Sequence, residues 1–117
     1  MSRRPTPEGS VLKAVLDLLA VHHVWHRRMN TGAVKTEHRG KSRVFRFGSK
    51  GMADVLALAP LEGTSACYTI WVEAKAPGGK QSEAQKAFQA EVEAEGHVYL
   101  LVDDVQQLAD WLKERGL

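Results

Sequence analysis

Two near-continuous apolar runs restrict what this chain can fold into. They cover residues 52–59 and 68–72, and the short segment PLEGTSAC joins them. A strand with one solvated face alternates apolar and polar residues, whereas a strand that is covered on both faces is apolar throughout. The two runs therefore predict central strands of a sheet with cover on both faces, and we expect them to form an antiparallel pair.

Helical segments are predicted on both sides of these strands. In TPEGSVLKAVLDLLAVHH, Thr6 suits the N-cap and Pro7 the first helical position. A second helix begins at SEAQ and ends at Gly96, the buried strand HVYLLVD follows, and Asp103 or Asp104 caps a last helix, VQQLADWLKER. The order α, several β, α, β, α predicts an α/β fold in which helices flank a mixed sheet.

The size and composition are typical of one soluble globular domain. With 117 residues, 44% of them hydrophobic, the chain can bury a core as a single domain, 1–117. Cys67 is the only cysteine, which excludes an intrachain disulfide framework and a thiolate metal cluster. No apolar run is long enough to cross a bilayer, and MSRRPTPEGS lacks the apolar region of a secretion signal. We therefore expect a cytoplasmic protein with no membrane partner.

Positive charge is concentrated between residues 26 and 50. The segment holds eight Lys or Arg against Glu37, so it carries +7 while the other residues sum to −5. Such segregation is typical of proteins that bind a polyanion. AVKTE and RVFRF predict a β-hairpin around HRGKS, so a solvated basic hairpin is the alternative interpretation. The candidate nucleic-acid-binding residues are Arg27, Arg28, Lys35, Arg39, Lys41, Arg43, Arg46 and Lys50.

Charged side chains end the second apolar run. In YTIWVEAKAPGGKQSEAQ, Glu73 and Lys75 are two residues apart and so point to the same face of a strand. Asp54, near the start of the other run, meets Glu73 if the strands are antiparallel. Two adjacent carboxylates repel each other unless a proton or a cation joins them, and Mg²⁺ is bound by one or two carboxylates. The residues predict part of a metal-dependent phosphodiester site, in which Lys75 orients a water or offsets charge on a phosphate.

The same residues also have a purely structural interpretation. Glu73 and Lys75 would then form an ion pair at a strand end, and the turn at Gly51 would satisfy Asp54. The tripeptide E-x-K is common and by itself favours this interpretation. The longer order of G-x-x-D, a loop, a strand ending in E-x-K, a Gly-rich turn and a helix with a glutamine is much more specific, and it favours a functional site.

This order resembles the VRR-NUC family, the virus-type replication and repair branch of the PD-(D/E)XK nuclease superfamily. The matching segments are GMAD at 51–54, VEAKAPGGKQSEAQ at 72–85, RRMNTGAVK at 27–35 and an early helix with Glu8, so the resemblance covers nearly the whole chain. It implies a restriction-endonuclease-like PD-(D/E)XK core. Ala53 departs from the pattern, since many relatives have a proline there, but proline shapes the backbone and adds no chemistry.

The resemblance implies a metal site that holds Mg²⁺ or Mn²⁺. Asp54 and Glu73 would bind the metal, and the Ala74 carbonyl would be a further ligand. Lys75 would be the catalytic lysine. Glu8 would add a carboxylate from the first helix, although an acid in a first helical turn is also stabilising without any metal.

Two further residues take roles from the resemblance. Gln85 would be a catalytic-site residue on the helix that flanks the metal. The segment Ser82-x-x-Gln85 is also a capping box, so the glutamine serves both roles only if its carbonyl and its amide act separately. Asn30, in the family's Asn–Gly segment, joins the candidate nucleic-acid-binding residues.

Residues and resemblance together predict a metal-dependent, structure-selective DNA endonuclease of a bacterium or of a phage in its host's cytoplasm. Branched or Holliday-junction-like DNA in replication or repair is the substrate that the resemblance implies. A homodimer would place two sites on the two strands of a junction. The alternatives are a non-catalytic nucleic-acid-binding module that uses residues 26–50, and a scaffold protein whose acidic residues only cap turns.

Overall fold

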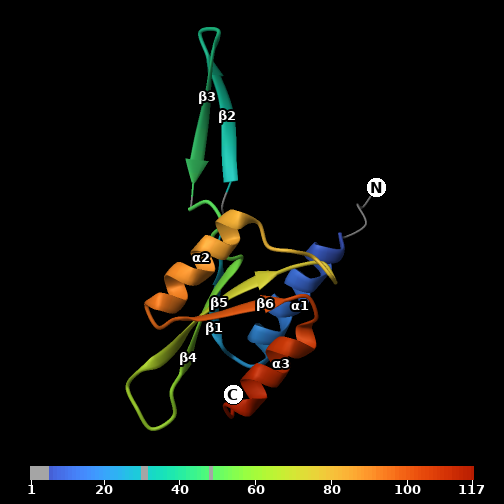
Figure 1. The fold of residues 1–117 in the computed structure, drawn as a ribbon, viewed down its shortest axis with the longest axis vertical. Helices are drawn as coiled ribbons and strands as arrows, with labels where there is room; N and C mark the ends of the chain where they lie inside the picture. Colours follow the sequence, from blue (N-terminus) through green and yellow to red (C-terminus); the bar gives the residue numbers. More distant parts are fainter. Residues whose placement is uncertain (1–5, 30–31, 48) are drawn as a thin grey trace.

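The computed structural model describes residues 6–29, 32–47 and 49–117 (Figure 1). The helices and strands, in chain order, are α1 (Pro7–Val21), β1 (Trp25–Arg28), β2 (Gly32–His38), β3 (Lys41–Phe47), β4 (Val55–Pro60), β5 (Cys67–Ala74), α2 (Glu83–Ala94), β6 (Val98–Val102) and α3 (Val105–Glu114). The predicted class, a mixed sheet flanked by helices, is confirmed.

A four-stranded mixed sheet lies at the centre, in the order β1-β4-β5-β6. Strand β4 is antiparallel to both β1 and β5, while β5 and β6 are parallel. The predicted antiparallel pairing of the two apolar runs is confirmed, with Val55 opposite Val72. The first run was expected to be a strand from residue 52, but β4 begins at Val55 because residues 51–54 form a turn and bend that lead into it.

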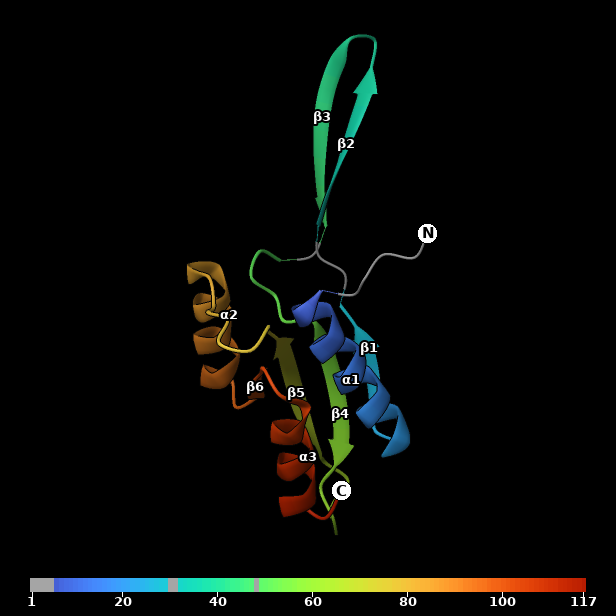
Figure 2. The ribbon, with the colours of Figure 1, turned by 90° about the vertical axis from the view of Figure 1, so that its right-hand side faces the viewer.

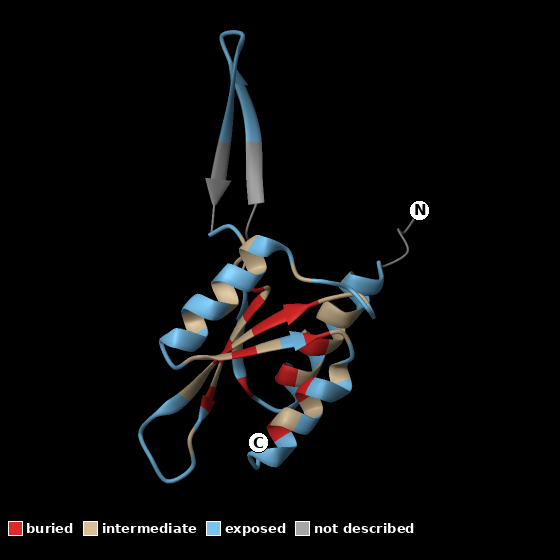
Figure 3. Cartoon of the chain, viewed as in Figure 1, coloured by how far each residue is buried: buried red, intermediate tan, exposed pale blue. Residues whose placement is uncertain are grey.

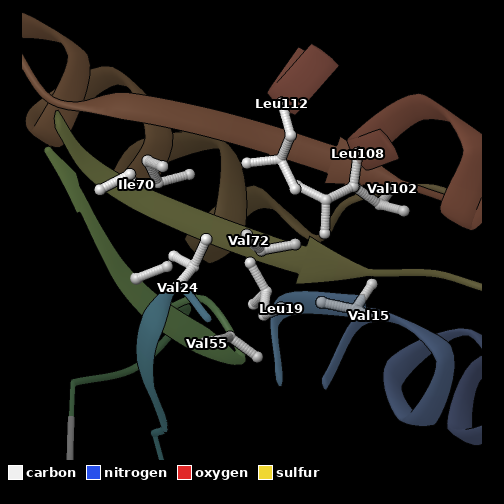
Figure 4. Close-up of a cluster of buried hydrophobic side chains, with 11 residues drawn as sticks. Val15, Leu19, Val24, Val55, Ile70, Val72, Val102, Leu108 and Leu112 are labelled. Atoms are coloured by element: carbon white, nitrogen blue, oxygen red, sulfur yellow. The ribbon is translucent and has the colours of Figure 1, made fainter. Parts of the chain in front are cut away.

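The helices cover the sheet on both faces, with α1 and α3 on one side and α2 on the other (Figure 2). Buried residues follow the central strands and the inner sides of α1 and α3 (Figure 3). Figure 4 shows the core between the sheet and these two helices, where the fully buried side chains include Val15, Leu19, Ile70, Leu108 and Leu112. This packing explains why both central strands are apolar on each face.

The helix starts agree with the capping signals. The Thr6 hydroxyl accepts a hydrogen bond from the Gly9 amide at 2.9 Å. Ser82 caps α2 and Asp104 caps α3, and each helix has a complete capping box. The last cap, predicted at either of two aspartates, is therefore Asp104.

The α2 side of the sheet is where the charged end of β5 lies. Side chains alternate along a strand, so Trp71 and Glu73 face away from the core that holds Ile70 and Val72. Phe88 of α2 packs edge-to-face on Trp71, with the ring centroids 5.1 Å apart. The Glu73 side chain therefore lies between the sheet and α2, while the first turn of α1 reaches the same end of β5 through Glu8.

Strands β2 and β3 form a separate two-stranded hairpin that extends away from the body (Figures 1 and 2). Its turn contains Arg39 at φ 52° and Gly40 at φ 73°. Left-handed conformations at both central residues are typical of the tight turns that match the twist of paired strands. The predicted hairpin around HRGKS is thus confirmed.

None of the helices in the described part of the chain has the length and hydropathy needed to span a membrane.

Candidate active site

Asp54 and Glu73 lie opposite each other where β4 begins and β5 approaches its end. Continuing the register one residue beyond Val55 and Val72 pairs these two acids. The Asp54 carboxylate accepts a hydrogen bond from the Ala74 amide at 2.8 Å. The interpretation in which the Gly51 turn satisfies Asp54 is therefore wrong, because the acid is held across the strand pair by β5.

Glu73 is the most unusual residue of the site because it is an acid that is only 3% exposed. Gln85 donates a hydrogen bond to its Oε1 at 2.8 Å, but its Oε2 is buried and accepts none within the described residues. Burial, and next the nearby charge of Asp54, raise the pKa of Glu73 to about 8, although Lys75 acts in the opposite direction. Without a cation, this carboxyl group is therefore largely protonated at neutral pH.

The pKa of Asp54 is raised as well, and burial is the largest cause. The Ala74 amide opposes that shift by donating to the charged form, while the charge of Glu8 adds to it. Two neighbouring carboxyl groups thus both resist ionisation, and a bound cation would relieve the cost of charging them together.

Lys75 lies between the sheet and the start of α1. Its Nζ is 3.9 Å from Glu73 Oε1 and 3.7 Å from Glu8 Oε1, and its side chain is 14% exposed. The Lys75 amide donates to the Val102 carbonyl at 2.9 Å, which fixes the backbone just beyond β5. Both ion pairs are long, so the ammonium can still donate to a further acceptor.

Gln85 both completes the capping box of α2 and contacts the site, the two roles that the sequence left open. Its Oε1 accepts from the Ser82 amide at 2.9 Å, which completes the capping box of α2. Its Nε2 donates to Glu73 Oε1 at 2.8 Å. The carbonyl end therefore caps the helix, while the amide end holds the buried acid.

Gly51 explains why the GMAD segment begins with glycine. Its φ is +82°, and a Cβ at this position would lie 2.2 Å from the Ala84 carbonyl oxygen. A side chain would have to displace the backbone of α2 next to Gln85. The missing Cβ thus allows the turn before Asp54 to pack directly against the helix that carries Gln85.

The predicted metal ligands come together only in part. Within the described residues, no group of three or more His, Cys, Asp and Glu side chains is arranged to hold a metal ion. The Glu8 carboxylate contacts Lys75 instead, so its role as a ligand stays a prediction. The chemistry of the remaining donors fits Mg²⁺ or Mn²⁺, because Asp54 and Glu73 offer two facing carboxylates, one with an unpartnered buried oxygen, and Mg²⁺ completes its shell with water.

Sequence reasoning missed a polar network beside the site. Gln81 donates to Gln89 Oε1 at 2.9 Å and to the Tyr99 hydroxyl at 3.1 Å, which ties the Gly-rich turn to α2 and β6. Burial raises the pKa of Tyr99 to about 12, so the hydroxyl stays protonated at neutral pH. Alternation along the strand is the only signal in the sequence for the direction of Tyr99. The structure pairs Tyr99 with Trp71, so both side chains face α2.

The candidate nucleic-acid-binding residues do not form one cluster. Arg27 and Arg28 lie on β1 of the main sheet, and the Arg27 guanidinium stacks 4.6 Å above the Trp25 ring. Lys50 is exposed near the start of α2. Four residues, Lys35, Arg39, Lys41 and Arg43, lie exposed on the hairpin. Arg46 lies on β3, and Asn30 is outside the described residues.

Comparisons with protein-family models, with curated proteins and with solved structures found no match. The VRR-NUC resemblance therefore stays a prediction from the motifs.

Proposed function

We propose that this protein is a metal-dependent endonuclease that hydrolyses phosphodiester bonds of DNA at Asp54, Glu73 and Lys75. The observation that carries the proposal is the buried Glu73 carboxyl, which faces a second acid and has an oxygen, Oε2, that accepts no hydrogen bond from the described part of the chain. If Glu73 served only in an ion pair with Lys75, we would expect the ammonium to contact the unpartnered oxygen, Oε2. The Lys75 ammonium is instead 3.9 Å from Oε1. Such a pair of acids is more typical of a cation site.

Each residue has a role that follows from its contacts. Asp54 and Glu73 would hold Mg²⁺ or Mn²⁺, with the Ala74 carbonyl as the proposed third protein ligand. When bound, the cation polarises a phosphate oxygen and lowers the pKa of a coordinated water. Gln85 orients the Glu73 carboxylate through its 2.8 Å hydrogen bond.

Lys75 supplies positive charge to the site. Glu8 and Glu73 hold its ammonium from two directions at 3.7 and 3.9 Å, which restricts where the side chain can point. From this position Lys75 donates a hydrogen bond to the phosphate oxygen on which negative charge develops. Removing one such donor typically lowers the rate by about 10²–10³-fold.

The family, the shape of the DNA substrate and the oligomeric state are part of the same proposal. We place the chain in the VRR-NUC family with a PD-(D/E)XK core, acting on branched or junction-like DNA as a homodimer. What supports the family is the order of its motifs and the way that β4, β5 and α2 bring Asp54, Glu73 and Gln85 together. The substrate shape and the dimer follow from the resemblance alone.

Cleavage assays test the proposal directly. Purified protein is incubated with Mg²⁺ or Mn²⁺ and labelled linear, flapped, nicked and four-way DNA, next to Glu73→Gln and Lys75→Met. We expect metal-dependent cleavage that both variants lose, while Glu62→Gln, an exposed acid in the β4–β5 loop, retains it. Mn²⁺ should also raise the melting temperature of the wild type and not that of Glu73→Gln.

The assay also distinguishes the rival function. The exposed basic hairpin favours a nucleic-acid-binding module that needs no metal. Such a module would bind all the substrates, cut none of them, and show no dependence on Mn²⁺ in either melting or binding. That result would exclude the nuclease.

A further inference from the structure

The two faces of the β2–β3 hairpin differ in charge. The register pairs Thr36 with Arg43 and His38 with Lys41, so these side chains share one face. The other face carries the remaining described side chains of the two strands, which are Lys35, Glu37, Ser42 and Val44. The first face has two cations and no acid, whereas on the second Glu37 offsets Lys35. Among these described side chains, the net positive charge therefore lies on one face.

The basic face is also hollowed. A depression of about 450 Å³ lies near the tip of the hairpin and is lined by Thr36, His38, Arg39, Lys41 and Arg43. All five residues are exposed, and Arg39 adds a third cation from the turn. We call this surface, from Thr36 to Arg43 on the one face, the tip surface. A concave surface with three cations and no acid is complementary to a polyanion.

The hairpin is free to enter a groove because no other part of the described chain covers it. Its strands pair only with each other, and both views show it standing clear of the body (Figures 1 and 2). An isolated two-stranded hairpin is at most marginally stable in water. A surface of this kind gains stability from contact with a partner.

Described residues on either side of the hairpin segment contact the candidate active site. Met29, just before the hairpin segment, donates its amide to the Asp54 carbonyl at 2.7 Å. After the hairpin, Gly51 packs against the backbone of Ala84 and Gln85. The chain on either side of the hairpin segment is thus held, at Met29 and at Gly51, beside the residues that carry the proposed chemistry.

We propose that the tip surface binds double-stranded DNA, with the two-stranded ribbon lying in the major groove. This inference deepens the proposed function and depends on it for the class of substrate. The major groove of B-form DNA is about 12 Å wide and admits a two-stranded β-ribbon. The major groove of an A-form RNA duplex is too narrow for side chains to enter, so the ribbon selects DNA over RNA.

The test uses two lysines of the same hairpin that lie on opposite faces. Lys41→Gln removes one charge from the tip surface, and Lys35→Gln removes one from the other face. Affinity for a short DNA duplex is measured in EDTA, which prevents metal-dependent cleavage, over a range of salt concentrations. For Lys41→Gln we expect weaker binding and a slope of log K against log salt that is smaller by about 0.9. The proposal takes Lys35 out of the candidate nucleic-acid-binding residues, because the register places it on the other face, so for Lys35→Gln we expect the wild-type affinity and slope.

Each alternative outcome contradicts a defined part of the proposal. Equal effects of the two substitutions would show that binding follows net charge and not the tip surface. Equal competition by an RNA duplex of the same sequence would overturn the major-groove placement. Because the measurement needs no cleavage, it separates the two proposals. If the protein cleaves DNA but Lys41→Gln and Lys35→Gln weaken binding equally, the tip surface is refuted and the nuclease is not. If only Lys41→Gln weakens binding but no metal-dependent cleavage is seen, the nuclease is refuted and the tip surface is not.

Discussion

Replacing Glu73 by glutamine should change how the stability of the metal-free protein depends on pH. The pKa of Glu73 is about 8 in the folded protein, against an ordinary value of 4.5. Between these values the folded state keeps a proton that the unfolded state has lost. The stability contributed by the neutral form is therefore complete below about pH 4.5, falls as the pH rises, and is lost above about pH 8.

The size of this effect follows from the shift. At about 1.4 kcal/mol per pH unit, the difference between 8 and 4.5 corresponds to roughly 5 kcal/mol of unfolding free energy. This figure is an upper limit, because water admitted beside the charged carboxylate lowers the cost of ionisation. Since small domains are stable by only about 5–15 kcal/mol, even half of it would dominate the pH profile.

The measurement is denaturant unfolding in EDTA at a series of pH values from 5 to 9. In Glu73→Gln the amide is neutral throughout, and its carbonyl can still accept the hydrogen bond from Gln85. The wild type should lose stability relative to this variant as the pH rises, whereas Glu62→Gln should follow the wild type. Parallel profiles for the wild type and Glu73→Gln would refute the argument that burial holds this acid in its neutral form.

Two further predictions concern the packing that holds the site. Gly51→Ala should destabilise the protein by more than Gly63→Ala in denaturant unfolding, because both glycines have a positive φ, but only at Gly51 does a Cβ meet backbone, at 2.2 Å. An alanine with a positive φ costs about 1–3 kcal/mol at either position, so equal losses of stability in the two variants would contradict the close packing of Gly51 against α2. Gln85→Leu should cost about 1–3 kcal/mol more than Gln107→Leu in the same assay, because both remove a capping box, but only Gln85 also donates to the buried Glu73. Equal losses would show that the contact with Glu73 adds nothing to the cap.

Features that depend on neighbouring residues were predicted well from the sequence. The caps at Thr6 and Ser82 need only a side chain that reaches an amide three residues away. The hairpin turn at Arg39 and Gly40 requires the left-handed conformations that glycine favours. The apolar runs predicted β4 and β5 because burial on both faces leaves a direct mark on composition.

Features that depend on residues distant in the sequence were predicted less well. Nothing near Asp54 indicates that the Ala74 amide is its partner, since that contact exists only once the register of β4 and β5 is set. The same holds for the hydrogen bond between Gln81 and Tyr99, which joins a loop to an edge strand. The segregation of charge on the hairpin was also hidden, because net charge counts Lys35 and Lys41 alike and only the register places them on opposite faces.

The charges of the site and of the hairpin imply an order of events for the proposed nuclease. At the site three acids, Glu8, Asp54 and Glu73, outnumber the cations whose charge acts on them, Lys75 and Arg28, so full ionisation leaves an excess of negative charge. A phosphate group brings more negative charge and is repelled until a proton or a cation compensates the acids. The tip surface carries no acid and imposes no such condition. DNA should therefore bind the hairpin with or without metal, so that Mn²⁺ changes cleavage far more than it changes affinity.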